Sequence, residues 1–229
     1  MKISIVLPAH NEEEKIHTIL SDLTAKFPNS EMIVVCNACT DSTPQIVENF
    51  GKVNKNVKCI NLTQLGKGIA LIEGFKHAKG EIVGYVDADY AFDANDVFKI
   101  ISELKNSDCV IASKWKGQKF SSAYGSFGRK VASRIWNFLV KILLGLEFQD
   151  TQAGLKFFKK EVFDSIDKDF VCKGFAFDAE LLYKIKNKGF KIKEVYIKPK
   201  PTRKSTFSFK HAPKMLFDII KLRLNSQKK

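Results

Sequence analysis

Residues 82–89 read Ile-Val-Gly-Tyr-Val-Asp-Ala-Asp, an apolar run that ends in two carboxylates one residue apart. A short apolar run rich in β-branched and aromatic residues predicts a buried strand at 82–86. Carboxylates are costly to place beside a core unless something offsets their charge. A divalent ion that also binds phosphates would do so, which makes Asp87 and Asp89 candidate metal ligands. The alternative is an ordinary strand-end turn, because Asp is a common turn former.

Similar apolar runs recur on both sides of this segment and alternate with amphipathic stretches. Further strands are expected at 3–7, 32–36, 57–62, 109–112, 155–158 and 192–197, and helices at 12–27, 43–50, 68–78, 95–104, 131–146, 177–188 and 213–224. The strand–helix alternation predicts an α/β fold with a Rossmann-like, mostly parallel sheet and helices on both faces. Ligands of such sheets bind beyond the carboxyl ends of the strands, where Asp87 and Asp89 stand.

The chain has 229 residues, of which 45% are hydrophobic, so it can bury one sizeable core. No linker, internal repeat or low-complexity tract divides it. We therefore expect one domain, residues 1–210, followed by a basic amphipathic C-terminal helix within residues 211–229. The five cysteines are odd in number, which indicates reduced thiols rather than a disulfide framework.

The balance of charge is strongly basic. Lysine and arginine together number 38 against 25 acidic residues, which gives a formal net charge of +13. Such a charge implies an anionic partner, which can be nucleic acid, acidic lipid or a phosphorylated substrate. The basic residues are spread along the chain and form no recognised nucleic-acid-binding module, so we expect no nucleic-acid partner. A basic nucleic-acid-binding protein is kept as an alternative.

Two segments bear on membrane contact. The N-terminal apolar run is too short for a signal peptide, and no stretch approaches the ~20 apolar residues that span a bilayer. Residues 135–144 are nevertheless too apolar all round for an ordinary exposed helix, and residues 213–224 form a basic amphipathic pattern. Together they predict a cytoplasmic protein bound peripherally to an anionic membrane surface. The alternative is that both helices pack into the core or into a dimer interface.

Polar turns follow the first two predicted strands. The first, Pro8-Ala9-His10-Asn11-Glu12, stands where a dinucleotide-binding fold would place its glycine fingerprint, which is absent. Its Asn11 and Glu12 can hydrogen-bond a base or ribose, or Asn11 can cap the next helix. We expect Glu12 in the first turn of that helix, where the helix dipole favours it. In the second turn, Asp41 can serve a nucleotide or only cap the helix that follows.

Three later segments also carry polar groups at predicted element ends. Gly66-Lys67-Gly68 is not a P-loop, but its glycines allow a phosphate to approach Lys67. Residues 150–154 read Asp-Thr-Gln-Ala-Gly, and residues 177–180 read Phe-Asp-Ala-Glu. Asp178 and Glu180 face different directions on a helix, so at most one of them points into a given site. The alternatives are an ordinary turn at Gly66 and helix capping at the two acids.

Taken in order, these motifs resemble those of family 2 glycosyltransferases, which have the GT-A fold, over about residues 2–208. They look most like the motifs of polyprenyl-phosphate (dolichyl-phosphate) glucosyl- and mannosyltransferases. Each motif is loose, but the ordered set is specific. The resemblance implies inverting transfer of a hexose from a UDP- or GDP-linked donor to a polyprenyl phosphate, with Mg²⁺ or Mn²⁺ bound at the site.

The resemblance also implies roles for particular positions. The nucleotide and its diphosphate would be bound by Pro8, Ala9, Asn11, Glu12, Asn37, Asp41, Lys67, Asp87, Ala88 and Asp89. Asp87 would contact the donor and Asp89 the metal, while Asp178 matches an acidic position near the acceptor, which makes Asp87 and Asp178 the candidate catalytic residues. Further binding candidates are Lys114, Arg129 and Arg134 for the acceptor phosphate, Gln152 in the 150–154 segment, and Arg203, Lys204 and Ser205 in a segment that closes over the diphosphate.

This sequence departs from the family pattern in three places. Residues 35–39 read Val-Cys-Asn-Ala-Cys where the family often has Val-Asp-Asp-Gly-Ser, so an acidic nucleotide contact is either lost or replaced by Asn37. Ala91 stands where mannosyl relatives often have a metal-binding Gln, and the form of the 150–154 segment looks more like the glucosyl branch. Relatives often append transmembrane helices, and none is found here.

Two other functions within the family are alternatives to hexose transfer onto a polyprenyl phosphate. The acceptor could be a soluble molecule or a protein, or the chain could be a non-catalytic sensor of nucleotide sugars. Retention of both Asp87 and Asp89 argues against a sensor. A lipid phosphate is already an anionic nucleophile, so positioning and charge neutralisation should matter more than a strong general base.

Overall fold

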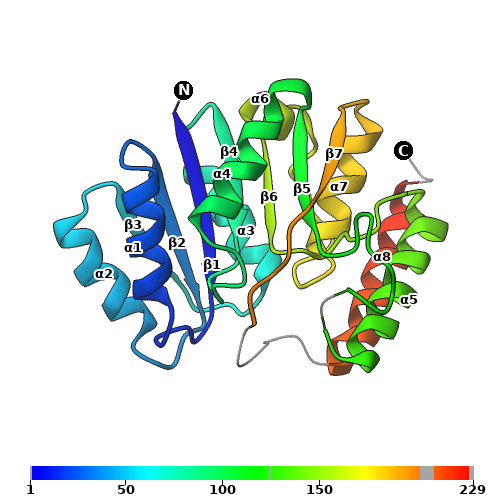
Figure 1. Cartoon of the computed structure of the whole chain (residues 1–229), viewed down its shortest axis with the longest axis horizontal. Helices are drawn as coiled ribbons and strands as arrows, with labels where there is room; N and C mark the ends of the chain where they lie inside the picture. Colours follow the sequence, from blue (N-terminus) through cyan, green and yellow to red (C-terminus); the bar gives the residue numbers. More distant parts are fainter. Residues whose placement is uncertain (1, 124, 202–208, 227–229) are drawn as a thin grey trace.

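The computed structural model describes residues 2–123, 125–201 and 209–226, and within these ranges seven strands form one sheet. The strand order is β3-β2-β1-β4-β6-β5-β7 (Figure 1). The strands are β1 (Ile3–Ala9), β2 (Glu31–Asn37), β3 (Val57–Leu62), β4 (Ile82–Val86), β5 (Cys109–Ser113), β6 (Leu155–Lys159) and β7 (Ile192–Tyr196). The helices are α1 (Ile16–Lys26), α2 (Thr43–Val53), α3 (Lys67–His77), α4 (Ala94–Ser102), α5 (Phe127–Leu144), α6 (Lys160–Ser165), α7 (Phe177–Asn187) and α8 (Ala212–Ser226), with short 3₁₀ turns η1 (Glu103–Asn106) and η2 (Phe209–His211).

The direction of the strands places the site. Parallel pairing links β3, β2, β1 and β4, and β7 runs parallel to β5. β6 runs antiparallel between β4 and β5. The mostly parallel α/β sheet is thus confirmed, with one reversed strand that the sequence pattern did not reveal. Because β6 is reversed, its first residues lie at the same edge of the sheet as the ends of β1, β2 and β4.

Side chains of the central strands alternate between two apolar layers, as the pleat of a strand requires. In β1, Ile5 and Leu7 belong to the layer that α1 and α4 cover, whereas Val6 belongs to the layer that α3 and α7 cover. Figure 1 shows α1 and α4 in front of the sheet and α3 behind it. The prediction of helices on both faces is therefore confirmed.

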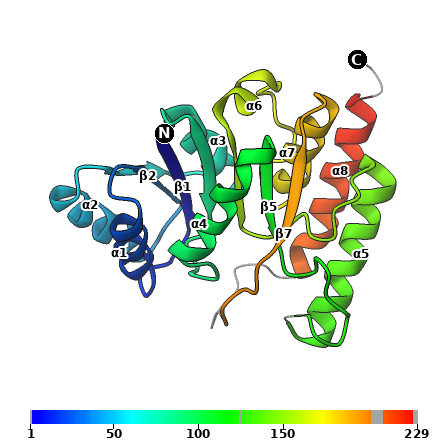
Figure 2. The ribbon, with the colours of Figure 1, turned by 45° about the horizontal axis from the view of Figure 1, so that its top comes forward.

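α5 and α8 lie side by side beyond the β7 end of the sheet (Figure 2). One face of the pair joins the core through Val140 and Leu144 of α5 and through Met215, Ile219 and Leu222 of α8. Large apolar side chains on the other faces are exposed, namely Phe127, Ile135, Phe138 and Ile142 on α5 and Phe217, Ile220 and Leu224 on α8. None of the helices in the described ranges has the length and apolar character needed to cross a bilayer.

α1 begins at Ile16 rather than at residue 12, so the acidic residues before it do not occupy its first turn. The N–H groups at the start of the expected helix are bound elsewhere, because Glu12 N–H donates to Thr43 Oγ1 at 2.8 Å and Glu13 N–H donates to Asp41 Oδ2 at 3.1 Å. The N-cap is Lys15, so Asn11 does not cap this helix. α6 is a further short helix that the sequence did not predict.

A buried carboxylate clamps the opposite edge of the sheet, where β1, β2 and β4 begin. Oε1 of Glu31 accepts hydrogen bonds from Ser4 Oγ and from Lys79 N–H, each at 2.5 Å, and Ser4 Oγ accepts the Gly80 N–H at 2.7 Å. Burial alone would raise the pKa of Glu31, but the hydrogen bonds from Ser4 and Lys79 outweigh it and lower the pKa. The ionised carboxylate therefore holds the starts of three strands together.

Glu31→Ala should lower the free energy of unfolding by about 2 kcal/mol at pH 7, because it leaves a buried hydroxyl and a backbone amide without their acceptor. The folded-state pKa of Glu31 lies below its ordinary value of 4.5. Its contribution is therefore fully present above that value and is lost as the pH falls through the lowered pKa. Urea unfolding followed by circular dichroism at several pH values measures both effects.

The matched control for this experiment is Glu14→Ala, because Glu14 is exposed in the turn before α1. The control should change stability by less than about 0.5 kcal/mol. An equal loss in both variants, or a Glu31 effect that grows as the pH falls, would contradict the clamp.

Candidate active site

Two cavities meet at the edge of the sheet where the parallel strands end. The first has a volume of about 640 Å³ and extends from the turns after β1 and β2 to α8. The second, of about 310 Å³, lies toward α5. Lys67, Asp87 and Asp89 line both cavities. One small group of charged side chains therefore stands between two binding spaces.

The two aspartates are positioned by the end of β4 and the start of β6. Asp87 N–H donates to Gly154 O at 2.8 Å, which joins the two strands. A Cβ on Gly154 would stand 1.9 Å from Oδ2 of Asp87, so only glycine leaves room for this carboxylate. Asp89 Oδ1 accepts the Ala91 N–H at 3.0 Å. Burial, followed by the nearby charge of Asp87, raises the pKa of Asp89.

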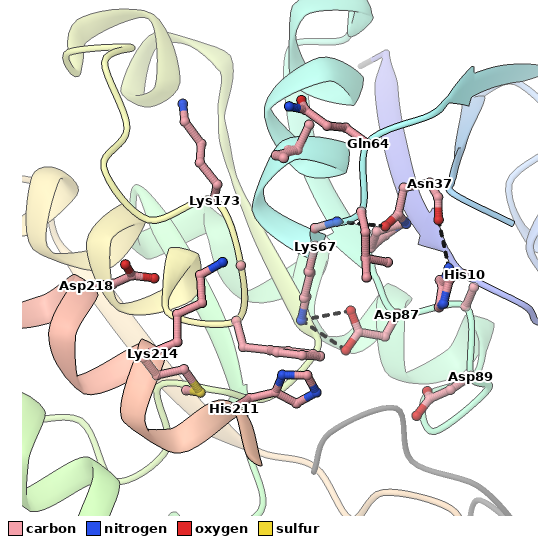
Figure 3. A pocket seen from close by; sticks show the side chains of 18 of the residues that line it. His10, Asn37, Gln64, Lys67, Asp87, Asp89, Lys173, His211, Lys214 and Asp218 are labelled. Carbon is pink, nitrogen blue, oxygen red and sulfur yellow. Dashed lines mark hydrogen bonds and ion pairs between the residues drawn. The ribbon is translucent and has the colours of Figure 1, made fainter. Parts of the chain in front are cut away.

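The turn after β2 is locked by Asn37, whose side-chain amide is bound within the protein. Its Nδ2 donates to Ala9 O at 2.8 Å, and its Oδ1 accepts the Gly66 N–H at 3.1 Å. The backbone oxygen of Asn37 lies 2.8 Å from Nδ1 of His10, a contact drawn in Figure 3. A carbonyl oxygen can only accept, so Nδ1 carries the proton and Nε2 of the neutral ring is an acceptor. Pro8, His10 and Asn37 all line the first cavity.

Asn11 and Asp41 lie outside both cavities. Asn11 has a positive φ of 56°, and its Oδ1 accepts the Thr40 N–H at 2.8 Å. Asp41 accepts the N–H groups of Thr43 and Glu13 at 3.0 and 3.1 Å. Both side chains join the two turns to each other, and their expected contacts with a nucleotide stay predictions. The side chain of Ala9 is buried in the core, and Ala88 lines the first cavity.

A chain of alternating charges runs from Asp87 into the core. Lys67 reaches from the start of α3 to Asp87 (Figure 3), and its Nζ lies 2.9 Å from Asp87 Oδ1 and 3.3 Å from Asp178 Oδ2. On the other side of Asp178, Lys156 of β6 donates to Oδ1 at 2.7 Å, and the Tyr85 hydroxyl donates to the same oxygen. Lys156 and Asp178 are both fully buried. Burial lowers the pKa of Lys156 and raises that of Asp178.

Asp178 itself lines neither cavity. The sequence predicted a catalytic role for it near the acceptor, but its carboxylate lies behind Lys67 and is contacted by two lysines and a tyrosine. Among the described residues, Lys67 stands between this carboxylate and the cavities, and the role of Asp178 near an acceptor stays a prediction. Glu180 points elsewhere and accepts the N–H groups of Val171 and Cys172 at 3.0 and 2.6 Å. Neither acid caps α7.

Cationic side chains and an aromatic ring line the second cavity. Lys114, Arg129, Gln152 and Trp136 line it. With its side-chain amide turned over, so that the oxygen and nitrogen exchange places, Gln152 donates to Phe175 O at 2.9 Å and accepts from Trp136 Nε1 at 3.2 Å. Arg129 stands in the first turn of α5, where backbone N–H groups have no partner within the helix. This combination suits an anionic group beside an apolar one.

Four further residues were predicted for the site, namely Arg134, Arg203, Lys204 and Ser205. Arg134 lines neither cavity, and its guanidinium lies 5.2 Å from the ring of Trp115. Arg203 and Lys204, like Ser205, lie outside the described residues.

Comparison with known proteins assigns the family. The model of "Glycosyl transferase family 2" matches residues 4–167, which include β1 to β6 and both aspartates at the strand ends. This chain belongs to glycosyl transferase family 2. It is therefore a glycosyltransferase, and its α/β sheet is the GT-A fold that the sequence motifs implied.

Similar proteins extend the comparison to most of the chain. Glycosyltransferase AglD of Haloferax volcanii is 28% identical over 203 residues, which cover 85% of this chain and 32% of that protein. Dolichyl-phosphate beta-glucosyltransferase ALG5A of Trichomonas vaginalis is 29% identical over 238 residues, covering 96% of this chain and 72% of that protein. This chain therefore spans about a third of the length of the first relative and most of the length of the second. Glucosyl-3-phosphoglycerate synthase of Mycobacterium tuberculosis, solved with Mn²⁺, uridine diphosphate and phosphoglyceric acid, has a TM-score of 0.72 at 19% identity, over 98% of this chain and 78% of that one.

The oxygen atoms at the site fit a divalent ion whose remaining ligands come from a substrate. Asp87 and Asp89 are neighbouring carboxylates, and Glu12 lies on the same cavity wall. Burial raises the pKa of Glu12, and the negative charges of Asp89 and Asp87 add to this effect, whereas Lys15 opposes it. No group of three or more His, Cys, Asp or Glu side chains in the described part of the chain is arranged to hold a metal alone. Mg²⁺ typically binds one or two carboxylates plus substrate phosphates and waters. Asp87 and Asp89 would supply the protein's share.

Several residues of the site were not singled out by the sequence. His10 lies within a quoted motif, and Trp136 was assigned to the membrane segment. Phe175 comes from the loop before α7 and His211 from η2, and neither stands in a recognisable pattern. Lys156 could have been found from the sequence, because a lysine inside the apolar run 155–158 is unusual and indicates a buried charge. A charge in a buried strand needs a partner, and here that partner is Asp178.

Gly154→Ala should weaken Mn²⁺-dependent binding of uridine diphosphate by about 10- to 100-fold, because the new methyl group must push Asp87 aside and small misplacements at a site are costly. Isothermal titration calorimetry measures the affinity. The control is Gly128→Ala, where the added Cβ meets nothing within 4 Å. Equal affinities in the two variants would show that the position of Asp87 does not matter for the diphosphate.

Proposed function

We propose that this glycosyltransferase moves a hexose from a nucleotide sugar to the phosphate of a polyprenyl lipid, with inversion at the anomeric carbon. The observation that carries the proposal is the meeting of two cavities at Lys67, Asp87 and Asp89. The first cavity suits a nucleoside diphosphate and the second an anionic acceptor. Two relatives named dolichyl-phosphate beta-glucosyltransferase, at 25% and 29% identity, support a glucosyl donor and a lipid acceptor.

The nucleotide occupies the first cavity in this proposal. Nε2 of His10 is oriented as an acceptor by the Asn37 carbonyl and can receive the imide N–H of a uracil ring. Asn37, whose amide is bound to Ala9 and Gly66, shapes the pocket rather than reading the base. A structural neighbour contains uridine diphosphate, which supports a UDP-linked donor.

The reaction is a single in-line displacement. A divalent ion held by Asp87 and Asp89 would neutralise the diphosphate leaving group. Arg129 and the first-turn N–H groups of α5 hold the acceptor phosphate. One phosphate oxygen bonds to the anomeric carbon as the bond from that carbon to the diphosphate breaks, and the diphosphate keeps the electron pair. The attacking phosphate is already ionised, so no general base is needed, which agrees with the buried position of Asp178.

The exposed apolar side chains of α5 and α8 support a lipid acceptor. The same two helices help to line the second cavity, through Ala132 and Trp136 of α5 and Met215 of α8. We infer that this face lies on an anionic membrane surface, on the cytoplasmic side, with the acceptor phosphate at headgroup depth. Residues 211–229 would then act as a surface-binding unit beside the domain formed by residues 1–210.

A soluble phosphorylated acceptor is the second candidate. A structural neighbour was solved with phosphoglyceric acid, and such an acceptor presents the same phosphate chemistry to Lys114 and Arg129. Transfer assays with UDP-glucose and GDP-mannose, each offered a polyprenyl phosphate and phosphoglyceric acid, separate the two candidates. Transfer to the soluble acceptor alone would reject the lipid, and no donor turnover with any acceptor would reject the proposed transfer.

Arg129→Ala should raise the KM for the acceptor phosphate by about tenfold or more, because a charge-assisted contact to phosphate is lost. Donor affinity should change by less than about twofold. Initial rates at varied acceptor and calorimetry with the donor measure the two effects. The control is Lys141→Ala on the same helix, whose ammonium lies 3.8 Å from Glu147 near the other end of α5. Equal loss of donor and acceptor binding would contradict the assignment of Arg129 to the acceptor phosphate.

The double variant Phe138→Ser, Ile142→Ser should bind anionic vesicles more weakly than the native chain, since each native side chain is 62% exposed on α5. Binding should also weaken with salt, because exposed charges are screened. Flotation with vesicles that contain phosphatidylserine measures it. The control is Val53→Ser, Phe98→Ser, two exposed apolar residues on α2 and α4. A native chain that stays at the bottom of a low-salt gradient would rule out the membrane surface.

A further inference from the structure

Lys67 contacts two carboxylates at once. Its Nζ lies 2.9 and 3.1 Å from the two oxygens of Asp87 and 3.3 Å from Oδ2 of Asp178. The Lys67 side chain is only 12% exposed, so these charges lie largely out of water. One ammonium group is thus the counter-ion of a carboxylate in the cavity wall and of another in the core.

Neither carboxylate is fully satisfied by this lysine. Among the described residues, Oδ1 of Asp87 and Oδ2 of Asp178 are buried and accept no hydrogen bond, although Lys67 is at ion-pair distance from both. Only Oδ2 of Asp87 receives a Lys67 hydrogen bond. A carboxylate oxygen has two lone pairs, so Oδ1 of Asp87 can accept a second cation beside the Lys67 ammonium.

A divalent ion on Asp87 and the ammonium of Lys67 are like charges on one carboxylate. They repel each other, most strongly where water is excluded. Lysine has a flexible four-carbon stem, and Lys67 already has a second partner in Asp178. It can therefore leave Asp87 without being left unpaired.

The second partner is held firmly in place. Oδ1 of Asp178 receives Lys156 Nζ at 2.7 Å and the Tyr85 hydroxyl, and both Asp178 and Lys156 are fully buried. The ring of Tyr85 lies 5.2 Å from Nζ of Lys67 and 5.4 Å from Nζ of Lys156, within the range of cation–π attraction. Asp178 is thus a fixed anchor, whereas Asp87 stands at the open edge of the cavities.

We propose that Lys67 is a switching cation: it competes with the divalent ion for Asp87, and when the metal–donor complex binds it pivots on Asp178 and holds the donor's diphosphate. The assignment of the ligand rests on the proposed function. Lys67 is then a binding residue for the diphosphate, and Lys156 is a positioning residue that acts through Asp178.

The switch predicts opposite signs in two binding measurements. Without Lys67, the metal alone should bind more tightly, because its competitor is gone. The diphosphate in the presence of metal should bind more weakly, because a contact is gone. A lysine that only supports the fold would weaken both, and a lysine that only contacts phosphate would leave the metal alone unaffected.

The experiment uses the full chain with Lys67→Met, which keeps the length of the side chain and removes its charge. Mn²⁺ alone, followed by electron paramagnetic resonance, should bind about threefold or more tighter, and uridine diphosphate with saturating Mn²⁺ should bind about tenfold weaker by calorimetry. The control is Lys76→Met on the same helix, where the side chain is 63% exposed. It should leave both affinities unchanged. Weaker binding of Mn²⁺ alone to a folded Lys67→Met variant would overturn the proposal.

A measurement on the native chain covers the case in which the variant does not fold. The side-chain ammonium signals of Lys67 and Lys156 can be followed by ¹⁵N NMR during titration with Mg²⁺ alone. The Lys67 signal should shift or broaden at Mg²⁺ concentrations that leave the Lys156 signal unmoved. A Lys67 signal that is unchanged at saturating Mg²⁺ would overturn the competition for Asp87.

The two proposals fail in different ways. If the native chain transfers no sugar to a polyprenyl phosphate but shows the opposite signs, the acceptor assignment fails and the switch stands. If transfer occurs and Lys67→Met weakens both ligands equally, the switch fails and the proposed reaction stands. If the native chain binds no nucleoside diphosphate with any metal, both fail.

Discussion

The buried ion pair between Lys156 and Asp178 is the interaction on which the site depends. Both side chains are fully buried, and a lone charge at either position would cost several kcal/mol unless it lost its ionisation. The pair links β6 to the start of α7, and through Lys67 it extends to Asp87 at the strand ends. The charged wall between the two cavities is therefore anchored in the core through Asp178.

Much of the fold could be predicted because most strands are short, mainly apolar runs followed by turn residues. Val6 and its neighbours alternate between two layers, but both layers are apolar, so this strand appears in the sequence as a nearly continuous apolar run. The reversal of β6 could not be predicted, because a five-residue apolar run looks the same in either direction. The start of α1 was also misplaced, since it is set by Thr43 and Asp41, which lie in another turn.

The candidate site, like the fold, has features that the sequence revealed and features that it could not reveal. Asp87 and Asp89 could be found because two carboxylates after an apolar strand are chemically conspicuous. Asp178 was also found, and its role near the acceptor stays a prediction, because sequence spacing says nothing of what stands between a side chain and a cavity. The barrier is Lys67, which comes from a distant helix. Asn11 and Asp41 had two readings each, and the structure shows both side chains bridging neighbouring turns.

The place of β6 in the sheet also dictates an order of assembly. β6 is inserted between β4 and β5, so neither neighbour is complete until the chain has passed through β5 and α5 and returned. Contacts between segments far apart in sequence form slowly, because the entropy of closing the loop must be lost first. The first four strands can pair in parallel without β6, but Gly154 and Lys156 arrive only with it. The contacts of Asp87 with Gly154 and of Asp178 with Lys156 therefore form only when β6 has joined the sheet, and the site is incomplete until then.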